Sequence, residues 1–152
     1  MIPVPITNGG VTVKRLILAA GLLLSAVLVN AADDSKVKFV SHEVVAKGGS
    51  LATAPSFSVT VAHRDKAGMV EVHDKETDTL YVLDGSATIV TGGTMVGGSV
   101  TAPGQQRGSD IKGGTEQKLS KGDVMVIPAG IPHWFKDVPK SVDYYVVKVV
   151  AP

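Results

Sequence analysis

The chain has 152 residues, with 15 Lys and Arg, 14 Asp and Glu, 4 His and no Cys. This length fits one domain of ordinary size, and the absence of cysteine excludes disulfides, thiol catalysis and cysteine zinc ligands. The formal charge is +1, and the basic and acidic residues are dispersed along the sequence. The sequence therefore has no basic cluster of the kind that binds nucleic acid, and we expect a small molecule as the ligand. Abundant glycine, 17 residues, favours a turn-rich β domain over a helical bundle.

The first 31 residues have the three parts of a signal peptide. Lys14 and Arg15 precede an apolar stretch, residues 16–29, which is shorter than the roughly 20 residues that span a bilayer. Val29 and Ala31 occupy the −3 and −1 positions of a cleavage site. We therefore predict a cleaved signal helix, residues 1–31, with no stable membrane span after cleavage.

Two further expectations follow from this segment. Residues 1–12 contain no charge and add nothing that a signal peptide needs, so we expect translation to begin near Val13 on a non-AUG codon. The remaining chain, residues 32–152, forms the predicted folded domain. The architecture is of a bacterial type, so export places this domain in the periplasm or outside the cell.

From residue 37 onward, apolar residues recur mostly with the period of two that is typical of strands. Turn residues separate the apolar runs, and the Asp84-Gly85 pair is the strongest hairpin signal. A β-sheet with one apolar face must bury it against another sheet, so we predict an all-β, antiparallel sandwich or barrel. The predicted strands are residues 38–45, 57–63, 69–73, 80–83, 87–91, 117–119, 124–128, 133–136 and 142–150.

One segment, residues 92–114, departs from the strand pattern because it is rich in glycine. We predict a loop excursion between strands. Such a loop is either a solvated connection or a lid over the mouth of a barrel, with Arg107 as an anion contact.

The first cluster of chemically active residues lies in residues 71–78. Glu71 and His73 are two apart in a predicted strand, so their side chains leave the same face. Asp78 follows a short turn, where a returning strand would bring its carboxylate beside the imidazole. Glu76 is a spare carboxylate within reach if Asp78 points away.

The second cluster lies in residues 122–137, where an apolar strand ends in a turn of proline and glycine that leads to His133. Two histidines and one or two carboxylates inside a small barrel form a mixed nitrogen and oxygen site, suitable for Mn, Fe, Ni, Co or Zn. If Glu71 does not bind the ion, His73, His133 and Asp78 make the facial triad of non-haem Fe(II) oxygenases.

At these residues the chain resembles the cupin superfamily. The second cupin motif, G-x5-P-x-G-x2-H-x3-N, is matched by Gly122, Pro128, Gly130 and His133, with Asp137 in place of Asn. The first motif, G-x5-H-x-H-x3-4-E-x6-G, is matched in part: His73 fits its second His, Asp78 its Glu and Gly85 its last Gly. Glu71 stands where the first His is expected, and the leading Gly is absent at that spacing.

The resemblance implies a single-domain jelly-roll barrel of six to eight strands. It also implies that His73, Asp78 and His133 are metal ligands. The chemistry of Glu71, which departs from the motif, leaves it as a fourth ligand, a general base or a plain polar residue at the barrel mouth. Three His and one Glu around a divalent ion leave one positive charge, whereas this set leaves none. The extra carboxylate lowers the Lewis acidity and favours harder ions such as Mn or Fe.

The fold alone leaves the function open, so three hypotheses remain. The first is a metal-dependent enzyme of oxygenase, isomerase or lyase type, acting on a small polar molecule such as a sugar derivative, a hydroxy acid or a keto acid. The exported chain has only two arginines that could bind an anion in bidentate fashion, Arg64 and Arg107. This small number argues against phosphorylated substrates. The second is a non-catalytic ligand-binding barrel, with or without metal. The third is a self-associating protein, in which residues 146–150 form an edge strand of a homodimer.

Overall fold

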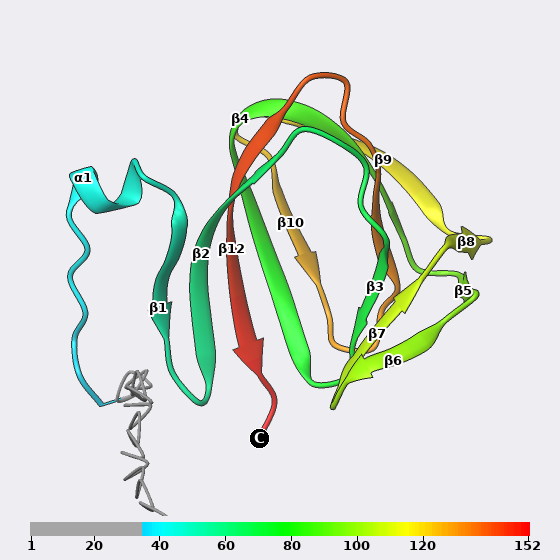
Figure 1. The fold of residues 1–152 in the computed structure, drawn as a ribbon, viewed down its shortest axis with the longest axis horizontal. Helices are drawn as coiled ribbons and strands as arrows, with labels where there is room; N and C mark the ends of the chain where they lie inside the picture. Colours follow the sequence, from blue (N-terminus) through cyan, green and yellow to red (C-terminus); the bar gives the residue numbers. More distant parts are fainter. Residues whose placement is uncertain (1–34) are drawn as a thin grey trace, which may run out of the picture.

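The computed structural model describes residues 35–152, and the predicted signal peptide, residues 1–31, lies outside this range. The regular secondary structure of the described chain consists almost entirely of antiparallel strands (Figure 1). No helix within residues 35–152 has the length and apolar character needed to cross a membrane. The elements are α1 (His42–Val45), β1 (Gly49–Thr53), β2 (Phe57–Arg64), β3 (Val70–His73), β4 (Glu76–Thr91), β5 (Thr94–Val96), β6 (Ser99–Ala102), β7 (Gln105–Gly108), β8 (Asp110–Lys112), β9 (Thr115–Ser120), β10 (Val124–Ile127), β11 (His133–Asp137) and β12 (Val142–Val150).

The strands form two walls that share β4 (Figure 1). The first wall contains β1, β2, β12, the first half of β4 and β10, in that order of pairing. The second wall contains β9, the second half of β4, β11, β3, β7 and β6. This arrangement is the predicted all-β, antiparallel jelly-roll barrel.

The core lies between the walls and follows from the predicted alternation. On β4, Leu80 and Val82 are 3% and 1% exposed, whereas Tyr81 between them is 44% exposed. Burial of an aliphatic side chain of this size contributes about 1.5–3 kcal/mol. The buried cluster comprises Leu80, Val82, Ala87, Ile89, Leu119, Ile127, Phe135, Val138, Val142 and Tyr144.

The predicted hairpin at Asp84-Gly85 is wrong, because β4 runs through both residues. Its first half pairs with β12 and its second half with β11 and β9, so the chain bends from one wall to the other without reversing. Gly85 has φ of 76°, and a Cβ atom there would lie 2.1 Å from the carbonyl oxygen of Ser141. Glycine is therefore required by both its backbone conformation and the close approach of Ser141, the residue before β12.

Three other expectations are also corrected. The predicted loop at residues 92–114 contains β5, β6, β7 and β8, because its glycines allow short hairpins, and β7 pairs with β3. The predicted strand at residues 38–45 is wrong, since a short helix, α1, occupies its second half. The predicted edge strand at residues 146–150 is interior, because β12 pairs with β2 on one side and β4 on the other.

Candidate metal centre

The register of three strands in the second wall arranges the candidate residues. Glu71 of β3 lies opposite His133 of β11 on one side and Arg107 of β7 on the other. Residues paired across strands project from the same face, so these three side chains form a row. Two residues along β3, His73 lies opposite Gln105 of β7 and forms a second row beside the first.

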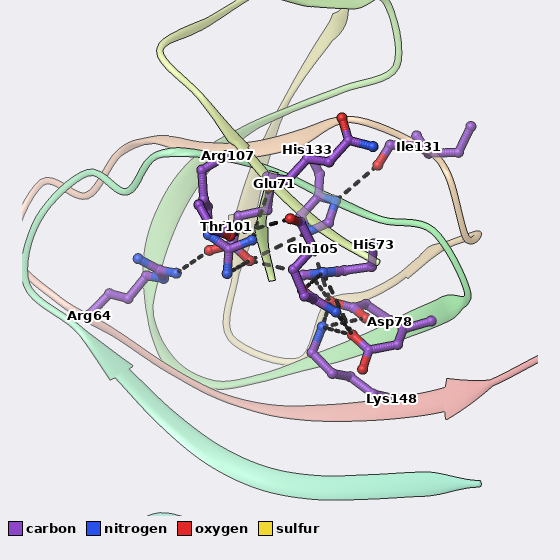
Figure 2. A network of polar contacts seen from close by, with 12 residues as sticks. Arg64, Glu71, His73, Asp78, Thr101, Gln105, Arg107, Ile131, His133 and Lys148 are labelled. Carbon is purple, nitrogen blue, oxygen red and sulfur yellow. Dashed lines mark hydrogen bonds and ion pairs between the residues drawn. The ribbon is translucent and has the colours of Figure 1, made fainter. Parts of the chain in front are cut away.

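The first wall faces these rows with Asp78 of β4 and Lys148 of β12, which are paired in register. Asp78 is only 4% exposed, and the Lys148 Nζ atom lies 2.9 Å from both of its carboxylate oxygens. Figure 2 shows this pair next to His73 and on the far side of His73 from Arg107. Glu71, His73, Asp78 and His133 thus converge from the two walls, as the sequence predicts.

The hydrogen bonds of His73 determine which of its ring nitrogens is free. Gln105 donates its Nε2 hydrogen to Glu76 Oε2 at 3.1 Å, which turns its Oε1 oxygen toward His73 Nδ1. An amide oxygen only accepts, so Nδ1 carries the hydrogen and Nε2 keeps its lone pair. Within residues 35–152, Nε2 is the one fully buried side-chain polar atom that lacks a hydrogen-bond partner.

His133 is held in the same tautomer by a backbone group. Its Nδ1 lies 3.0 Å from the carbonyl oxygen of Ile131, an acceptor, so Nδ1 again carries the hydrogen. Ile131 belongs to the proline and glycine turn before β11, and the Gly130 amide of that turn donates to the His73 carbonyl at 2.8 Å. The turn of the second motif therefore positions both histidines, whose rings lie 5.1 Å apart.

The inward nitrogens approach the two carboxylates at ligand-like spacing. Glu71 Oε2 lies 3.4 Å from His73 Nε2 and 3.9 Å from His133 Nε2, and Asp78 Oδ2 lies 3.6 Å and 3.8 Å from the same atoms. Around an ion with bonds of about 2.1 Å, neighbouring ligand atoms are about 3.0–3.4 Å apart. The donors are only slightly wider than that, so Glu71, His73 and His133 can hold a metal ion, as can His73, Glu76 and Asp78.

Charge in the site controls the protonation of Glu71. Burial alone would raise the pKa of its carboxyl, but the His73 contact and the positive charges of Arg107 and of His133, which is protonated at acidic pH, outweigh burial and lower the pKa to about 2. Burial also lowers the pKa of His133, although the Ile131 carbonyl and the nearby carboxylates oppose this. At neutral pH, Glu71 is therefore ionised and His133 is neutral, the states that bind metal.

Four residues of the site escaped sequence reasoning in these roles: Arg64, Gln105, Tyr144 and Lys148. Lys148 is the one charged residue among the four valines of residues 146–150, which was a usable signal. Arg64 and Arg107 were noted only as anion partners, yet their Nη2 atoms lie 3.6 Å and 3.8 Å from opposite oxygens of Glu71. Glu76 binds Lys148 at 3.2 Å and contacts His73 through Gln105.

The site opens into a cavity of about 180 Å³ inside the barrel. Its lining consists of Arg64, Met69, Glu71, Asp78, Leu80, His133, Phe135, Tyr144, Val146 and Lys148.

Several solved structures are similar to this chain. A protein from Bacillus halodurans has a TM-score of 0.55 at 16% identity, over 79% of this chain and 86% of that chain. The Schizosaccharomyces pombe Cnp3 cupin domain has a TM-score of 0.49 at 16% identity, over 68% and 59% of the two chains. KdgF from Halomonas sp. has a TM-score of 0.49 at 15% identity, over 69% and 80%.

The B. halodurans likeness shows the fold alone, and no curated protein matches the chain. The cupin family model, in contrast, matches residues 29–152, which include both motif regions and every residue of the site. By its sequence and its barrel, this chain belongs to the cupin family.

Proposed function

We propose that the protein is an exported, metal-dependent cupin enzyme that acts on a small polar molecule. The observation that carries this proposal is the pair of imidazoles whose Nδ1 hydrogens are engaged and whose Nε2 atoms meet two carboxylates. Outer acceptors of this kind fix the tautomer of metal-binding histidines and raise their basicity. His73, His133 and Asp78 are the proposed ligands.

Glu71 fits the role of a fourth ligand better than that of a general base. A carboxylate with a pKa of about 2 holds a proton poorly at neutral pH, so it is a weak base there. Two nitrogen and two oxygen donors suit Mn, Fe, Ni, Co or Zn. Such an ion would polarise a bound oxygen, which is the chemistry used by oxygenases, isomerases and lyases.

One observation favours the second candidate, a ligand-binding barrel without turnover. The Lys148 ammonium already neutralises Asp78 through two contacts of 2.9 Å, so this carboxylate is satisfied without an ion. A cupin in which Lys148 permanently holds Asp78 would bind its ligand without metal chemistry.

Elemental analysis separates the two candidates. The full chain is expressed, purified without chelator or affinity tag, and compared with a His73→Ala, His133→Ala double variant. We expect near-stoichiometric Mn, Fe, Ni, Co or Zn that disappears in the double variant. The control is His63→Ala, since His63 is exposed and binds Asp143 at 2.7 Å, away from the site. No metal in any sample, even after reconstitution, would favour the ligand-binding barrel.

Export and self-association are separate parts of the proposal. Cell fractionation should place the protein in the periplasm or medium, with a mature N-terminus at Ala32. Recovery of a precursor beginning at Met1 would contradict the predicted start near Val13. We also expect a homodimer, which sedimentation equilibrium measures directly.

A further inference from the structure

Arg64 is held rigidly at the wall of the barrel cavity. Its Nε atom donates to the Tyr144 hydroxyl at 3.0 Å, and its guanidinium carbon lies 4.7 Å from the centre of the Phe135 ring. Phe135 in turn stacks on Tyr144, with ring centres 5.1 Å apart. All three line the cavity. The Tyr144 hydroxyl and the Phe135 ring, which are neutral, hold the guanidinium plane, and the Glu71 carboxylate lies 3.6 Å from Nη2.

This arrangement leaves two hydrogen-bond donors available at the cavity wall, Arg64 Nη2 and the Tyr144 hydroxyl. Within residues 35–152, the hydrogen bond of Arg64 is the one from Nε to Tyr144. Its Nη2 atom lies 3.6 Å from the Glu71 carboxylate, which is too far for a hydrogen bond. The Tyr144 oxygen accepts from Arg64, so its own hydrogen is available. Tyr144 is 6% exposed, and burial raises the pKa of its hydroxyl, which therefore keeps that hydrogen at neutral pH.

The charge balance around the cavity favours an anion. Three cationic side chains, Arg64, Arg107 and Lys148, contact three anionic ones, Glu71, Glu76 and Asp78. These six charges cancel, so a divalent ion bound by the histidines and carboxylates would leave an excess of two positive charges. In a partly dry cavity such an excess is costly, and an anionic ligand relieves it.

The size of the cavity limits the ligand. A volume of about 180 Å³ is small beside the roughly 300–1,000 Å³ of typical ligand pockets. This size favours a small ligand, such as an acid of three or four carbons. Glu71 presents Oε1 to Arg64 and Oε2 to the histidines, so a ligand anchored at Arg64 has its neighbouring atoms beside the candidate metal ligands.

We infer that the cavity binds a small 2-hydroxy or 2-oxo carboxylic acid, whose carboxylate accepts hydrogen bonds from Arg64 and Tyr144. This inference rests on the proposed function, because the second oxygen of the acid would face the proposed metal ligands. A guanidinium and a hydroxyl side by side match the two oxygens of a carboxylate.

Calorimetric titration tests this site with lactate and pyruvate as probes and with lactamide as the uncharged match of lactate. Metal-free and zinc-loaded protein are both titrated. We expect saturable binding of at least one acid and none of lactamide. Arg64→Gln should weaken binding at least about 30-fold and Tyr144→Phe about tenfold, because each removes a hydrogen bond to a charged group.

Matched variants separate recognition from folding. Tyr145→Phe removes a hydroxyl from the adjacent residue of β12, which projects to the other face, so it should leave binding unchanged. Thermal unfolding and zinc content of each variant show whether the barrel and the metal site survive. Tyr144→Phe keeps the ring that stacks on Phe135 and so preserves the packing if Arg64→Gln does not fold.

Three outcomes overturn the inference: no saturable binding of either acid, binding that Tyr144→Phe leaves unchanged, or inorganic phosphate binding as tightly as the acids with the same dependence on Arg64. The proposed function fails separately. If the protein binds zinc but neither acid, the proposed metal site stands and this inference is wrong. If the protein binds lactate through Arg64 and Tyr144 but takes up no metal, the acid site stands and the proposed metal-dependent function is wrong.

Discussion

The two walls of the barrel cavity have different polar chemistry. On the wall of β3, β7 and β11, His73 and His133 are each held by an acceptor at Nδ1, and their Nε2 atoms are left for a ligand. On the wall of β2, β4 and β12, Arg64 and Lys148 hold acceptors directly, including the carboxylate of Asp78. The first of these, the donor wall, supplies orientated imidazole nitrogens beside the charged residues Glu71 and Arg107. The second, the charged wall, supplies the ion pair of Asp78 and Lys148. The proposed metal site therefore depends on both walls being held in register.

β4 is the strand that joins the walls, and Gly85 is where it bends. Gly85→Ala should lower the free energy of unfolding by about 3 kcal/mol or more, because it adds left-handed backbone strain and a contact with the Ser141 carbonyl at 2.1 Å. Gly92→Ala is the control, since Gly92 has a similar φ of 74° but open space around it. We expect it to cost about 1 kcal/mol.

Urea unfolding of the two variants measures the difference. Equal losses at Gly85 and Gly92 would mean that the bend is not constrained by Ser141, and that the walls can shift relative to each other.

Glu71 connects the walls electrostatically, which makes stability depend on pH. Its folded-state pKa of about 2 lies below the ordinary value of 4.5, so its ionised form stabilises the fold above pH 4.5. That stabilisation is lost as the pH falls from 4.5 to 2, and it amounts to at most about 3 kcal/mol at one pKa unit per 1.36 kcal/mol. Glu71→Gln should therefore flatten the stability curve of the metal-free protein in this range.

Chemical unfolding at several pH values between 6 and 2 tests this expectation. The matched variant is Glu116→Gln, since Glu116 forms an exposed pair with Lys136 at 2.7 Å. Exposed ion pairs contribute little to stability because solvent screens them, so this variant should keep the slope of the natural chain. If Glu71→Gln kept the same dependence of stability on pH, Glu71 would not contribute to the electrostatic contact between the walls.

The donor wall can be tested at Gln105, whose amide oxygen holds His73 Nδ1. Gln105→Leu should weaken zinc binding about 10- to 100-fold, because a metal-binding histidine without its outer acceptor loses orientation and basicity. Gln106→Leu is the control, since Gln106 is next to Gln105 on β7 and donates to the Asp74 carboxylate at 3.0 Å instead. Competition with a chromogenic chelator measures both affinities, and equal affinities would contradict the role of Gln105.

The two walls also differ in how far the sequence predicts them. Glu71, His73, Asp78 and His133 are close to one another along the chain or lie in motifs with fixed spacing, so their convergence follows from strand periodicity and resemblance. Arg64 and Lys148 meet the site only through the pairing of β12 with β2 and β4, which no local pattern encodes.

Errors in the predicted fold have the same physical origin. Asp84-Gly85 has the composition of a two-residue turn, but the strands on either side of it pair with different partners, and this long-range pairing turns the expected hairpin into a bend. Gln105 lies in a glycine-rich segment that looks like a loop. Its pairing with His73 across β3 and β7 makes it part of the site.

The smallest expected effect comes from the charged wall, at Lys148. Lys148→Met removes the ammonium that binds both oxygens of Asp78 and so leaves this carboxylate free for an ion. Zinc affinity should rise about three- to tenfold, while the metal-free protein loses about 1–3 kcal/mol of stability because a buried charge is left unpaired. Lys136→Met, at an exposed pair with Glu116, should change neither property.

Opposite signs for metal affinity and metal-free stability are the mark of a competing cation. If Lys148→Met instead weakened zinc binding, the ammonium would be holding Asp78 in position for the ion, and the two walls would cooperate in metal binding. A rise in affinity would mean that a divalent ion must displace Lys148 from Asp78 when it binds, and that the displaced ammonium becomes available to an anionic ligand in the same cavity.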